Sequence, residues 1–537
     1  MSFSDRSGET MQAASHVSRR TLLAGSAASL ALPLLPRTVR ALEAQAVPES
    51  AWRELDDPKN MTGGVQRPND PRFVTLTQPE NLRYYNPPAD PRKKPDPDAP
   101  FGVVRPHTPE QVAYALAWAR KYNLPMVPRS GGHSYAGCST VAGLTINSAA
   151  MRTVELQDGL IVAGGGAIFG DLLDTLRDTE VNSQAGRYTI THGRCRGVGL
   201  SAFLMGGGWA LDSSHLGMGC DRVKKVQLVL ADGSVVIASE KPSEHPDLFW
   251  AIRGGGGGNL AYATKWWLEP VVVENVVVFS GSWRVGTVVA QPLFGDLLDA
   301  LDATPPTMGA QMTLSATSGA YDSPWPFTIT LRCAFHGSRA EFDRLLGSVL
   351  ANIDKYVSKQ CDSHVCASND LLELPYWDAQ EFFEERGYPN RYQETSLFAG
   401  KISGEFIADM FQIWRERPAT IPAARVTVYR VGGKVNEVKP DATAFVHRTY
   451  RWMITTDIDW NDGGDPLLDK YLTWQRHVQD TFYKSLGGPG SYQNFPDPGL
   501  ADPAKAYWGS NLPRLSQIKK KYDPNSVFTP PRNQGIP

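Results

Sequence analysis

The sequence lacks several features that would assign it to other classes of protein. Beyond the N-terminus, no run of apolar residues reaches the roughly 18–20 that a membrane-spanning helix needs. The 537 residues include 54 basic and 56 acidic side chains, so no excess of positive charge marks a surface for nucleic acid. Internal repeats and long low-complexity tracts are also missing. We therefore expect a soluble globular body that binds no nucleic acid and has no membrane span once mature.

Cysteine is scarce too, with six residues in the chain. Their positions are Cys138, Cys195, Cys220, Cys333, Cys361 and Cys366. The last two lie five residues apart in a polar stretch, which suits either a disulfide in an oxidising compartment or two free thiols. His364 lies between them, but a structural zinc site needs four ligands at recognisable spacing, and nothing completes this one. We expect no metal.

The N-terminus has the pattern of a targeting segment. Arg19 and Arg20 stand directly before a modest apolar run, Leu22 to Leu35, and Ala44-Gln45-Ala46 fits a cleavage site. This pattern predicts a twin-arginine signal peptide over residues 1–46, with a short amphipathic leader or a chance arginine pair as the alternative. We expect the twin-arginine machinery to export the protein, which is then periplasmic or secreted.

The remaining length suits two domains rather than one core. We expect an N-terminal extension over residues 47–96, a first domain over 97–271, a second α+β domain over 272–500 and a C-terminal segment over 501–537. Alternation and helical spacing predict these elements: a helix over Pro109–Tyr122, and strands at Met126–Pro128, Leu160–Ala163, Val226–Leu230, Val235–Ala238, Val271–Phe279, Phe327–Cys333 and Arg425–Arg430. A further helix is predicted over Ala340–Val357, and a hairpin turn at Ala231–Ser234.

The first segment with chemical meaning is Arg129-Ser130-Gly131-Gly132-His133-Ser134-Tyr135, directly after a predicted strand. Adjacent glycines let the backbone approach a phosphate closely, and their N–H groups make a concavity that binds anions. A histidine in this loop is then held beside whatever follows the phosphate. A structural turn with a hydrogen-bonded histidine is the alternative.

A second segment, Gly193-Arg194-Cys195-Arg196-Gly197-Val198-Gly199, runs on to the triplet Gly206–Gly208. So much glycine costs chain entropy, and backbone packed against a flat ligand would account for it. Arg194 and Arg196 flank Cys195, a setting that favours the thiolate. Taken alone, the cysteine could also be a small buried hydrophobic residue.

Two more glycine runs help to decide which folds are possible. Gly254–Gly258 follow Phe249-Trp250-Ala251-Ile252-Arg253, and Gly164–Gly170 follow the strand at residue 160. The second run superficially matches the dinucleotide fingerprint. Its second and third glycines are one residue too far apart, however, and Glu180 falls in a polar loop instead of at a strand end. These departures exclude a Rossmann fold.

Together these segments resemble the FAD-linked oxidases of the vanillyl-alcohol oxidase/PCMH superfamily, in the berberine-bridge-enzyme-like branch. The resemblance covers nearly everything from Phe101 onward, including Ala444–Arg448, Tyr507–Leu515 and Lys521–Asn525. It implies an α+β fold: a two-lobed PCMH-type FAD-binding domain, an α+β substrate domain with an antiparallel sheet, and a C-terminal segment that returns to the FAD domain.

The resemblance also implies how the cofactor is held. His133 would be bonded to the 8α-methyl carbon of the flavin and Cys195 to C6. The other cofactor-binding residues would be Arg129, Ser130, Gly131, Gly132, Ser134, Tyr135, Gly193, Val198, Gly199 and Asn494. In the family a substrate hydride goes to flavin N5 while a base takes the hydroxyl proton, and oxygen reoxidises the flavin.

The base is where the chain departs from the family. Many members have a second tyrosine in a Tyr-x-Asn-Tyr motif, but here Tyr492-Gln493-Asn494-Phe495 places a phenylalanine at that position. Plant members use a glutamate on the strand after the His-Arg pair, and the count from His447-Arg448 reaches the apolar Ile454. Tyr492 is the nearest phenol and becomes the candidate catalytic residue, with packing under the ring as the alternative.

These observations predict an oxidase that acts on a hydroxyl of a saccharide or a secondary metabolite. Two alternatives stay open: an oxidative cyclase of an aromatic metabolite, and a flavin-carrying binding or redox protein with little turnover. The identity of the substrate and the choice between oxidase and dehydrogenase depend on cleft side chains that the sequence does not place.

Overall fold

The computed structural model describes residues 47–85, 99–181, 184–317, 319, 326–360, 367–385, 389–460 and 465–537. The chain divides into two units, residues 1–46 and 47–537, and the second is described below. The predicted signal peptide with Arg19 and Arg20 lies outside the described residues, as do Cys361, His364 and Cys366. No helix within the described ranges is long and apolar enough to cross a membrane.

Two sheets form the first part of this unit, residues 47–268, which we call the N-terminal lobe. The smaller sheet has the order β1-β2-β4-β3, with β1 antiparallel and the other strands parallel, and the larger sheet β11-β10-β12-β6-β5 is antiparallel throughout. Their strands are β1 (Val65–Gln66), β2 (Gly102–Val104), β3 (Met126–Arg129), β4 (Leu144–Asn147), β5 (Val154–Gln157), β6 (Leu160–Gly164), β10 (Val223–Val229), β11 (Val235–Ser239) and β12 (Tyr262–Leu268).

Short helices cover these sheets. In α4 the hydroxyl of Thr108 accepts a hydrogen bond from the Gln111 amide, and Pro109 occupies the first turn, where its missing N–H costs nothing. The helices of the lobe are α2 (Glu49–Asp56), α3 (Phe73–Thr77), α4 (Pro109–Lys121), α5 (Phe169–Leu176), α6 (Leu200–Met205), α7 (Ser213–Leu216) and α8 (Pro246–Ile252), with 3₁₀ turns η1 (Ser148–Ala150) and η2 (Gly219–Arg222). Four two-residue strands pair separately as β7 (Glu180–Val181) with β8 (Gln184–Ala185), and β9 (Tyr188–Thr189) with β13 (Val271–Val272).

A seven-stranded antiparallel sheet dominates residues 275–485, which we call the sheet lobe. Its strand order is β17-β14-β16-β15-β19-β20-β18. The strands are β14 (Asn275–Val285), β15 (Met308–Thr317), β16 (Phe327–Phe335), β17 (Ala367–Pro375), β18 (Arg391–Ala399), β19 (Ala423–Arg430) and β20 (Trp452–Trp460). The helices are α9 (Thr287–Asp302), α10 (Arg339–Phe342), α11 (Ser348–Gln360), α12 (Tyr376–Phe382), α13 (Gly404–Trp414) and α14 (Leu468–Ser485), with a π-helical turn η3 (Asp343–Gly347) and a 3₁₀ turn η4 (Lys434–Glu437).

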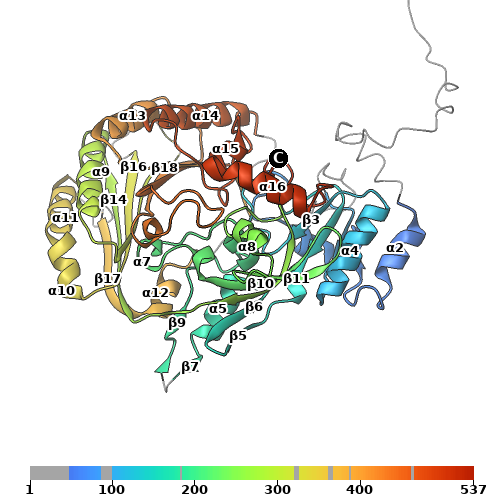
Figure 1. Ribbon diagram of the computed structural model, residues 1–537. Helices are drawn as coiled ribbons and strands as arrows, with labels where there is room; N and C mark the ends of the chain where they lie inside the picture. Colours follow the sequence, from blue (N-terminus) through green and yellow to red (C-terminus); the bar gives the residue numbers. More distant parts are fainter. Residues whose placement is uncertain are drawn as a thin grey trace, which may run out of the picture. The chain divides into compact units, whose positions relative to one another are not determined.

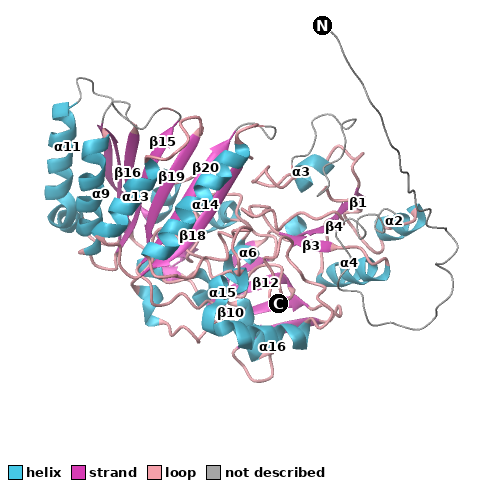
Figure 2. Ribbon diagram, turned by 90° about the horizontal axis from the view of Figure 1, so that it is seen from above, coloured by secondary structure: helices cyan, strands magenta, loops and turns pink. Residues whose placement is uncertain are grey.

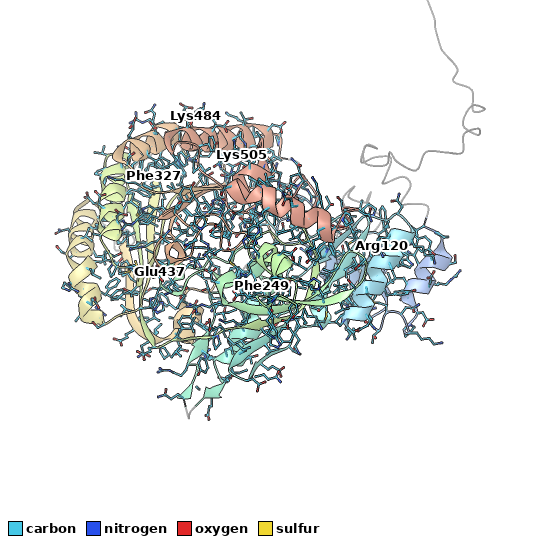
Figure 3. The ribbon with its side chains drawn as sticks, viewed as in Figure 1. Arg120, Phe249, Phe327, Glu437, Lys484 and Lys505 are labelled. Carbon is cyan, nitrogen blue, oxygen red and sulfur yellow. The ribbon has the colours of Figure 1, made fainter. Side chains whose placement is uncertain are left out.

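The two faces of this sheet differ because successive side chains of a strand point to opposite sides. Helices α9, α11, α13 and α14 cover one face (Figures 1 and 2), and the apolar side chains between them form one large core. Figure 3 places Phe327 in this interior and Lys484 at the outer surface of α14. The other face meets the N-terminal lobe, since Tyr429 of β19 packs edge-on against Trp209 with 4.6 Å between ring centroids.

The predicted α+β class with an antiparallel sheet is confirmed, and most predicted elements are present. Three details differ. The predicted strand Val271–Phe279 is two strands, β13 and a longer β14, and the helix over Ala340–Val357 is interrupted by η3. Glu180 lies in the short strand β7 instead of a loop. The domain boundaries at residues 97, 272 and 501 stay predictions.

The N-terminal extension is an integral part of the fold. Asn81 is fully buried, and its side-chain amide donates hydrogen bonds to the carbonyls of Tyr135, at 2.7 Å, and Tyr392, at 2.9 Å. The Glu80 amide donates to the Gly132 carbonyl at 3.1 Å. One short segment thus joins the loop after β3 to strand β18 of the sheet lobe.

The C-terminal segment returns to the N-terminal lobe, as predicted. It comprises α15 (Pro503–Trp508), the turn η5 (Gly509–Asn511) and α16 (Leu512–Tyr522). The indole of Trp508 donates to the Gly254 carbonyl at 3.2 Å, and the buried ammonium of Lys519 donates to the Asn259 carbonyl at 2.7 Å. This segment therefore closes over the glycine run at residues 254–258.

Replacing Asn81 by alanine should destabilise the protein, because two buried backbone carbonyls would lose their donor. We expect the free energy of unfolding in urea to fall by about 2 kcal/mol. Asn60→Ala is the matched control, since the Asn60 amide also donates to a backbone carbonyl, that of Glu54, but at the surface. Equal stability of both variants would show that the extension does not hold the lobes together.

Candidate active site

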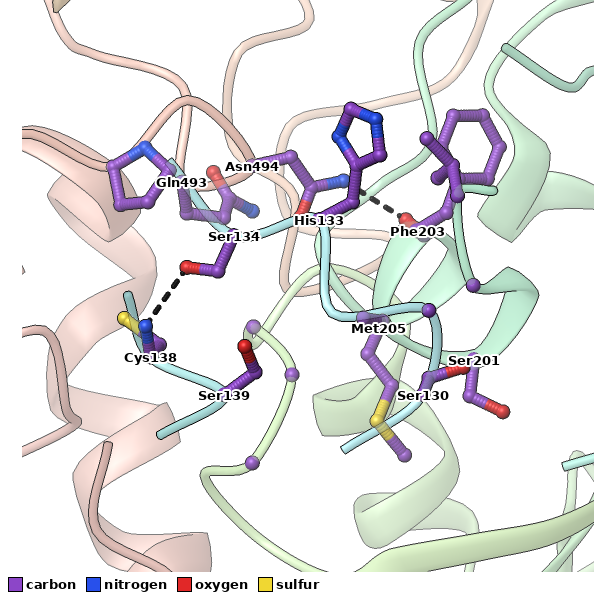
Figure 4. A pocket seen from close by; sticks show the side chains of 18 of the residues that line it. Ser130, His133, Ser134, Cys138, Ser139, Ser201, Phe203, Met205, Gln493 and Asn494 are labelled. Atoms are coloured by element: carbon purple, nitrogen blue, oxygen red, sulfur yellow. Dashed lines mark hydrogen bonds between the residues drawn. The ribbon is translucent and has the colours of Figure 1, made fainter. Parts of the chain in front are cut away.

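One cavity brings together every site residue predicted from the sequence. Its walls include Arg129, Ser130, Gly131, Gly132, His133, Ser134, Tyr135, Gly193, Cys195, Val198, Gly199, Tyr492 and Asn494. Figure 4 shows the imidazole of His133 beside the side chains of Phe203 and Asn494, which come from distant parts of the chain. The glycine run Gly256–Gly258 and the C-terminal residues Tyr507 and Gln534 complete the walls.

A backbone contact between two glycine loops shapes the cavity. A methyl group on Gly131 would lie 2.1 Å from the carbonyl oxygen of Gly197 and 2.5 Å from the amide of Gly199. A methyl group on Gly199 would likewise lie 2.4 Å from the Gly131 amide. These separations are well below any real contact. Gly131 and Gly199 are therefore needed for the loops to touch, whereas the left-handed φ of +77° explains the glycine at 132.

Three buried polar atoms of these loops have no hydrogen-bond partner among the described residues: Ser130 Oγ, His133 Nε2 and Arg194 Nη1. Unpartnered buried polar atoms are rare, and together in one cavity they indicate a ligand that supplies the missing contacts. Burial lowers the pKa of His133 to about 4, so its imidazole is neutral near pH 7. A neutral imidazole nitrogen is nucleophilic, which suits covalent chemistry.

Cys195 lies in a setting that opposes the expected thiolate. Burial, with the nearby carboxylate of Glu385, raises the pKa of Cys195 to about 12. The two neighbouring arginines are occupied elsewhere: Arg194 pairs with Glu385 at 3.0 Å and Arg196 with Asp174 at 2.6 Å. The expectation that these arginines favour a thiolate is therefore wrong, because carboxylates neutralise both.

Arg129 links the first glycine loop to the N-terminal extension. Its buried guanidinium donates to the carbonyls of Gln78, at 2.7 Å, and Thr77, at 3.3 Å. Burial lowers the pKa of Arg129 to about 10. The side chain thus ties the loop to the N-terminal extension, and a methyl group on Gly132 would collide with it at 2.2 Å.

Tyr492 and Asn494 line the cavity beside Phe203 and Trp209. The Tyr492 hydroxyl accepts hydrogen bonds from the amides of Gly208, at 3.0 Å, and Trp209, at 2.9 Å, and from the Asn494 side chain at 3.0 Å. Asn494 also donates to the Phe203 carbonyl at 3.0 Å. Burial raises the pKa of Tyr492, although these three donors oppose the shift.

The two other positions considered for the base carry no proton acceptor. Ile454 is buried in the core of the sheet lobe, on the face away from the cavity. Phe495 stacks on Tyr135 with 5.2 Å between ring centroids and 12° between ring planes. Tyr429 and Tyr492 also contact Phe495. Aromatic side chains therefore surround Phe495, which stands where many members of the family have a tyrosine.

The sequence reasoning missed the polar face of the seven-stranded sheet. Half-buried polar residues on this face are Ser280, Ser282, Thr313, Ser315, Thr328, Thr330, Arg332, Glu394 and Arg425. Glu394 is directly opposite Asp457, which is opposite Arg425, across β18, β20 and β19. Burial raises the pKa of Glu394, and so does the facing Asp457. The strict alternation of polar and apolar residues in β15, β16 and β19 was the available signal.

Glu385 was missed as well. It lines the cavity from the segment after α12, 190 residues beyond Cys195. Its two oxygens have different neighbours: Oε1 accepts from Arg194 and Arg332, at 3.0 and 2.9 Å, and Oε2 is 3.9 Å from the Cys195 sulfur. Nothing in the local sequence around Glu385 indicates this placement.

Comparison with known proteins identifies the family to which the chain belongs. A model described as "FAD binding domain" matches residues 100–239, and one described as "Berberine and berberine like" matches residues 491–537. The chain is 38% identical over 484 residues to an FAD-dependent monooxygenase of Cochliobolus heterostrophus, covering 80% of this chain and 83% of that protein. The chain belongs to the berberine-bridge-enzyme-like FAD-linked oxidoreductases.

Other relatives of this flavoenzyme agree. The xylooligosaccharide oxidase of Thermothelomyces thermophilus is 26% identical over 534 residues, covering 93% of this chain and 98% of that protein. Among solved structures, the glucooligosaccharide oxidase of Acremonium strictum has a TM-score of 0.73 at 21% identity and covers 89% of this chain and 98% of its own. That likeness establishes the shared fold.

The residues of the cavity fit an FAD. The wall contains a glycine-lined backbone, buried polar atoms that lack partners within the described residues, and a neutral imidazole. Aromatic and apolar side chains such as Phe203, Trp209 and Tyr262 supply surfaces for a flat ring system. The flavoenzyme therefore has a binding site of the right chemistry between its two glycine loops and its C-terminal segment.

The loop contact predicts a matched pair of variants. Gly131→Ala should force the loops apart and destabilise the flavoenzyme by about 1–3 kcal/mol, as other overpacked sites do. Gly197→Ala should be close to neutral, because a methyl group there would meet nothing within 4 Å. Urea unfolding of both variants tests the contact from its two sides, and a stable Gly131→Ala variant would contradict it.

Proposed function

We propose that this flavoenzyme is an oxidase whose FAD is covalently bound through His133 and also through Cys195, and that it oxidises a hydroxyl of a saccharide with oxygen as the acceptor. The observation that carries the proposal is the unpartnered, neutral His133 imidazole in the same cavity as Cys195. The polar sheet face reaches this cavity through Arg332, which pairs with Glu385 in the cavity wall. The glucooligosaccharide oxidase of Acremonium strictum, described as having a 6-S-cysteinyl, 8α-N1-histidyl FAD, supports attachment through two residues.

The proposed cofactor site uses the two glycine loops. Residues Ser130–Tyr135 and Gly193–Gly199 would hold the cofactor, with Asn494 as a polar contact, and Arg129 would support the first loop from behind. The bound flavin supplies a hydride acceptor. A double covalent attachment means that the protein does not have to enclose the ring to retain it, which leaves the side toward the sheet lobe available for substrate.

The polar sheet face supports a substrate with many hydroxyl groups. Its hydroxyl side chains stand in rows across neighbouring strands, such as Thr313 beside Thr427 at 3.1 Å and Ser282 beside Thr330 at 3.4 Å. Hydroxyl groups both donate and accept hydrogen bonds, so such a face suits a saccharide chain laid across it. The name of the xylooligosaccharide oxidase relative points to the same class.

The substrate's hydroxyl proton needs an acceptor, and Tyr492 is the residue that we propose. Three hydrogen-bond donors converge on its oxygen and would stabilise a phenolate. The carboxyl pair Glu394 and Asp457 is the second candidate, because it lies on the polar face of the sheet. Arg425 forms ion pairs with Asp457 and with Asp459. The two candidates predict that different variants lose activity: Tyr492→Phe removes the phenol, and Glu394→Gln removes a carboxylate.

The second candidate function is oxidative cyclisation of an aromatic metabolite. The stacked pair Tyr135 and Phe495, with Tyr429 and Trp209 nearby, supports it because such a wall also suits an aromatic ring. Export through the twin-arginine pathway stays a proposal that rests on Arg19 and Arg20.

The covalent attachment is tested by acid precipitation. Wild-type protein should keep its yellow colour in the pellet. His133→Ala should keep less of it, and the flavin that remains should be held through Cys195 alone. Peptide mass spectrometry of Cys195→Ala should show the histidyl bond and no thioether. Cys333→Ala is the control, since Cys333 is buried in the core of the sheet lobe. Unchanged retention in the His133→Ala, Cys195→Ala double variant would refute attachment through these two residues, and loss of the colour from the wild-type pellet would refute covalent attachment.

The substrate class is tested by measuring peroxide. A panel of oligosaccharides should give peroxide at a higher kcat/KM than phenolic alcohols. Thr313→Val should raise KM for the best saccharide about tenfold, the loss expected for one hydrogen bond of about 1.4 kcal/mol, and should leave kcat nearly unchanged. Thr473→Val, on the exposed side of α14, makes the same chemical change far from the sheet face and should have no effect. Preference for phenolic alcohols would favour the cyclase.

A further inference from the structure

Cys195 and Glu385 meet across the two lobes. The thiol comes from the loop between β9 and α6 and lines the cavity, while the carboxylate comes from the segment that follows α12. Their side chains are in hydrogen-bond contact, with the thiol as donor and Glu385 Oε2 as acceptor at 3.9 Å. Within the described residues, Glu385 is the acceptor that this thiol contacts.

The other oxygen of Glu385 is fixed by two arginines. Arg194 and Arg332, one from each lobe, both donate to Oε1 at 3.0 and 2.9 Å. This arrangement orients the carboxylate and leaves Oε2 free for the thiol. The Glu385 side chain is 42% exposed, and it lines the cavity, so a proton that it accepts can pass to water.

We propose that Glu385 is the proton acceptor that activates Cys195 for bonding to the flavin, with Arg194 and Arg332 as its positioning residues. The inference rests on the proposed second covalent bond. Cys195 loses its thiol proton to Glu385, and its sulfur forms a bond to a ring carbon that gives up a hydrogen. The two electrons released reduce molecular oxygen, which takes the two protons and becomes hydrogen peroxide.

The electrostatics explain why a proton acceptor is required. A thiol with a pKa near 12 is almost entirely protonated at neutral pH, and only the thiolate is a strong nucleophile. Burial by itself would raise the pKa of Glu385, but the charges of Arg194 and Arg332 bring it below its ordinary value. The carboxylate is therefore ionised across the neutral range and always available to accept the proton.

Glu385→Gln separates this role from a passive one, because the two predict opposite signs. Without a carboxylate, two arginine charges would remain beside the thiol and would lower its pKa, so a purely electrostatic role predicts faster bonding. A proton acceptor predicts slower bonding, by about 100-fold, which is a typical contribution of general-base catalysis. The amount of cysteinyl-flavin peptide, measured by mass spectrometry during incubation of the purified full-length variant in air, distinguishes the two.

The same molecule supplies an internal control. The histidyl bond at His133 should form normally in Glu385→Gln, which shows that the variant folds and binds flavin. Glu384→Gln is the matched control, because the Glu384 carboxylate lies near Arg196, at 3.8 Å, and not near the thiol. It should form both bonds at the wild-type rate.

The pH dependence tests the proposal without relying on the variant's stability. In the wild type the rate of thioether formation should be flat from pH 6 to 8, since Glu385 stays ionised. In Glu385→Gln it should rise about tenfold per pH unit, as hydroxide takes over the proton. A wild-type rate that rises in this way overturns the role of Glu385, as does unchanged or faster bonding in the variant. Wild-type protein with a histidyl bond and no thioether would overturn the proposed second bond itself.

Discussion

The contact between two glycine backbones determines where everything else in the site lies. Gly131 belongs to the loop that carries His133, and Gly197 and Gly199 belong to the loop that carries Cys195. Because neither Gly131 nor Gly199 has a side chain, the backbones of the two loops pack closely at these positions, and the histidine and cysteine reach the same cavity. A single methyl group at Gly131 would separate the two residues that the proposed chemistry needs together.

The parts of the site that the sequence predicted are those encoded by local pattern. The loop Ser130–His133 follows a strand whose end is visible in the sequence, and the glycine run that contains Cys195 is recognisable by composition. The predicted hairpin at Ala231–Ser234 forms because its turn residues suit the geometry. Strand alternation likewise predicted the segment Phe327–Cys333 within β16.

The parts that it did not predict depend on contacts between distant segments. Glu385 reaches Cys195 only because the sheet lobe packs on the N-terminal lobe, and the Arg129 guanidinium is fixed by two carbonyls of the N-terminal extension. The thiolate expected at Cys195 fails for the same reason: a local count of charges includes Arg194 and Arg196 but not the carboxylates that neutralise them. Ile454 depends on strand register in the same way. Successive residues of β20 point to opposite faces of the sheet, and Ile454 points into the core instead of toward the cavity.

The walls of the cavity come from residues as early as Val127 and as late as Gln534, three residues before the end of the chain. The ribosome makes the chain from its N-terminus, so the wall near Tyr507 and Gln534 is added long after the two glycine loops have been made. The cavity between the lobes is therefore complete only after Gln534 has been made, and the two glycine loops precede the segment that encloses them.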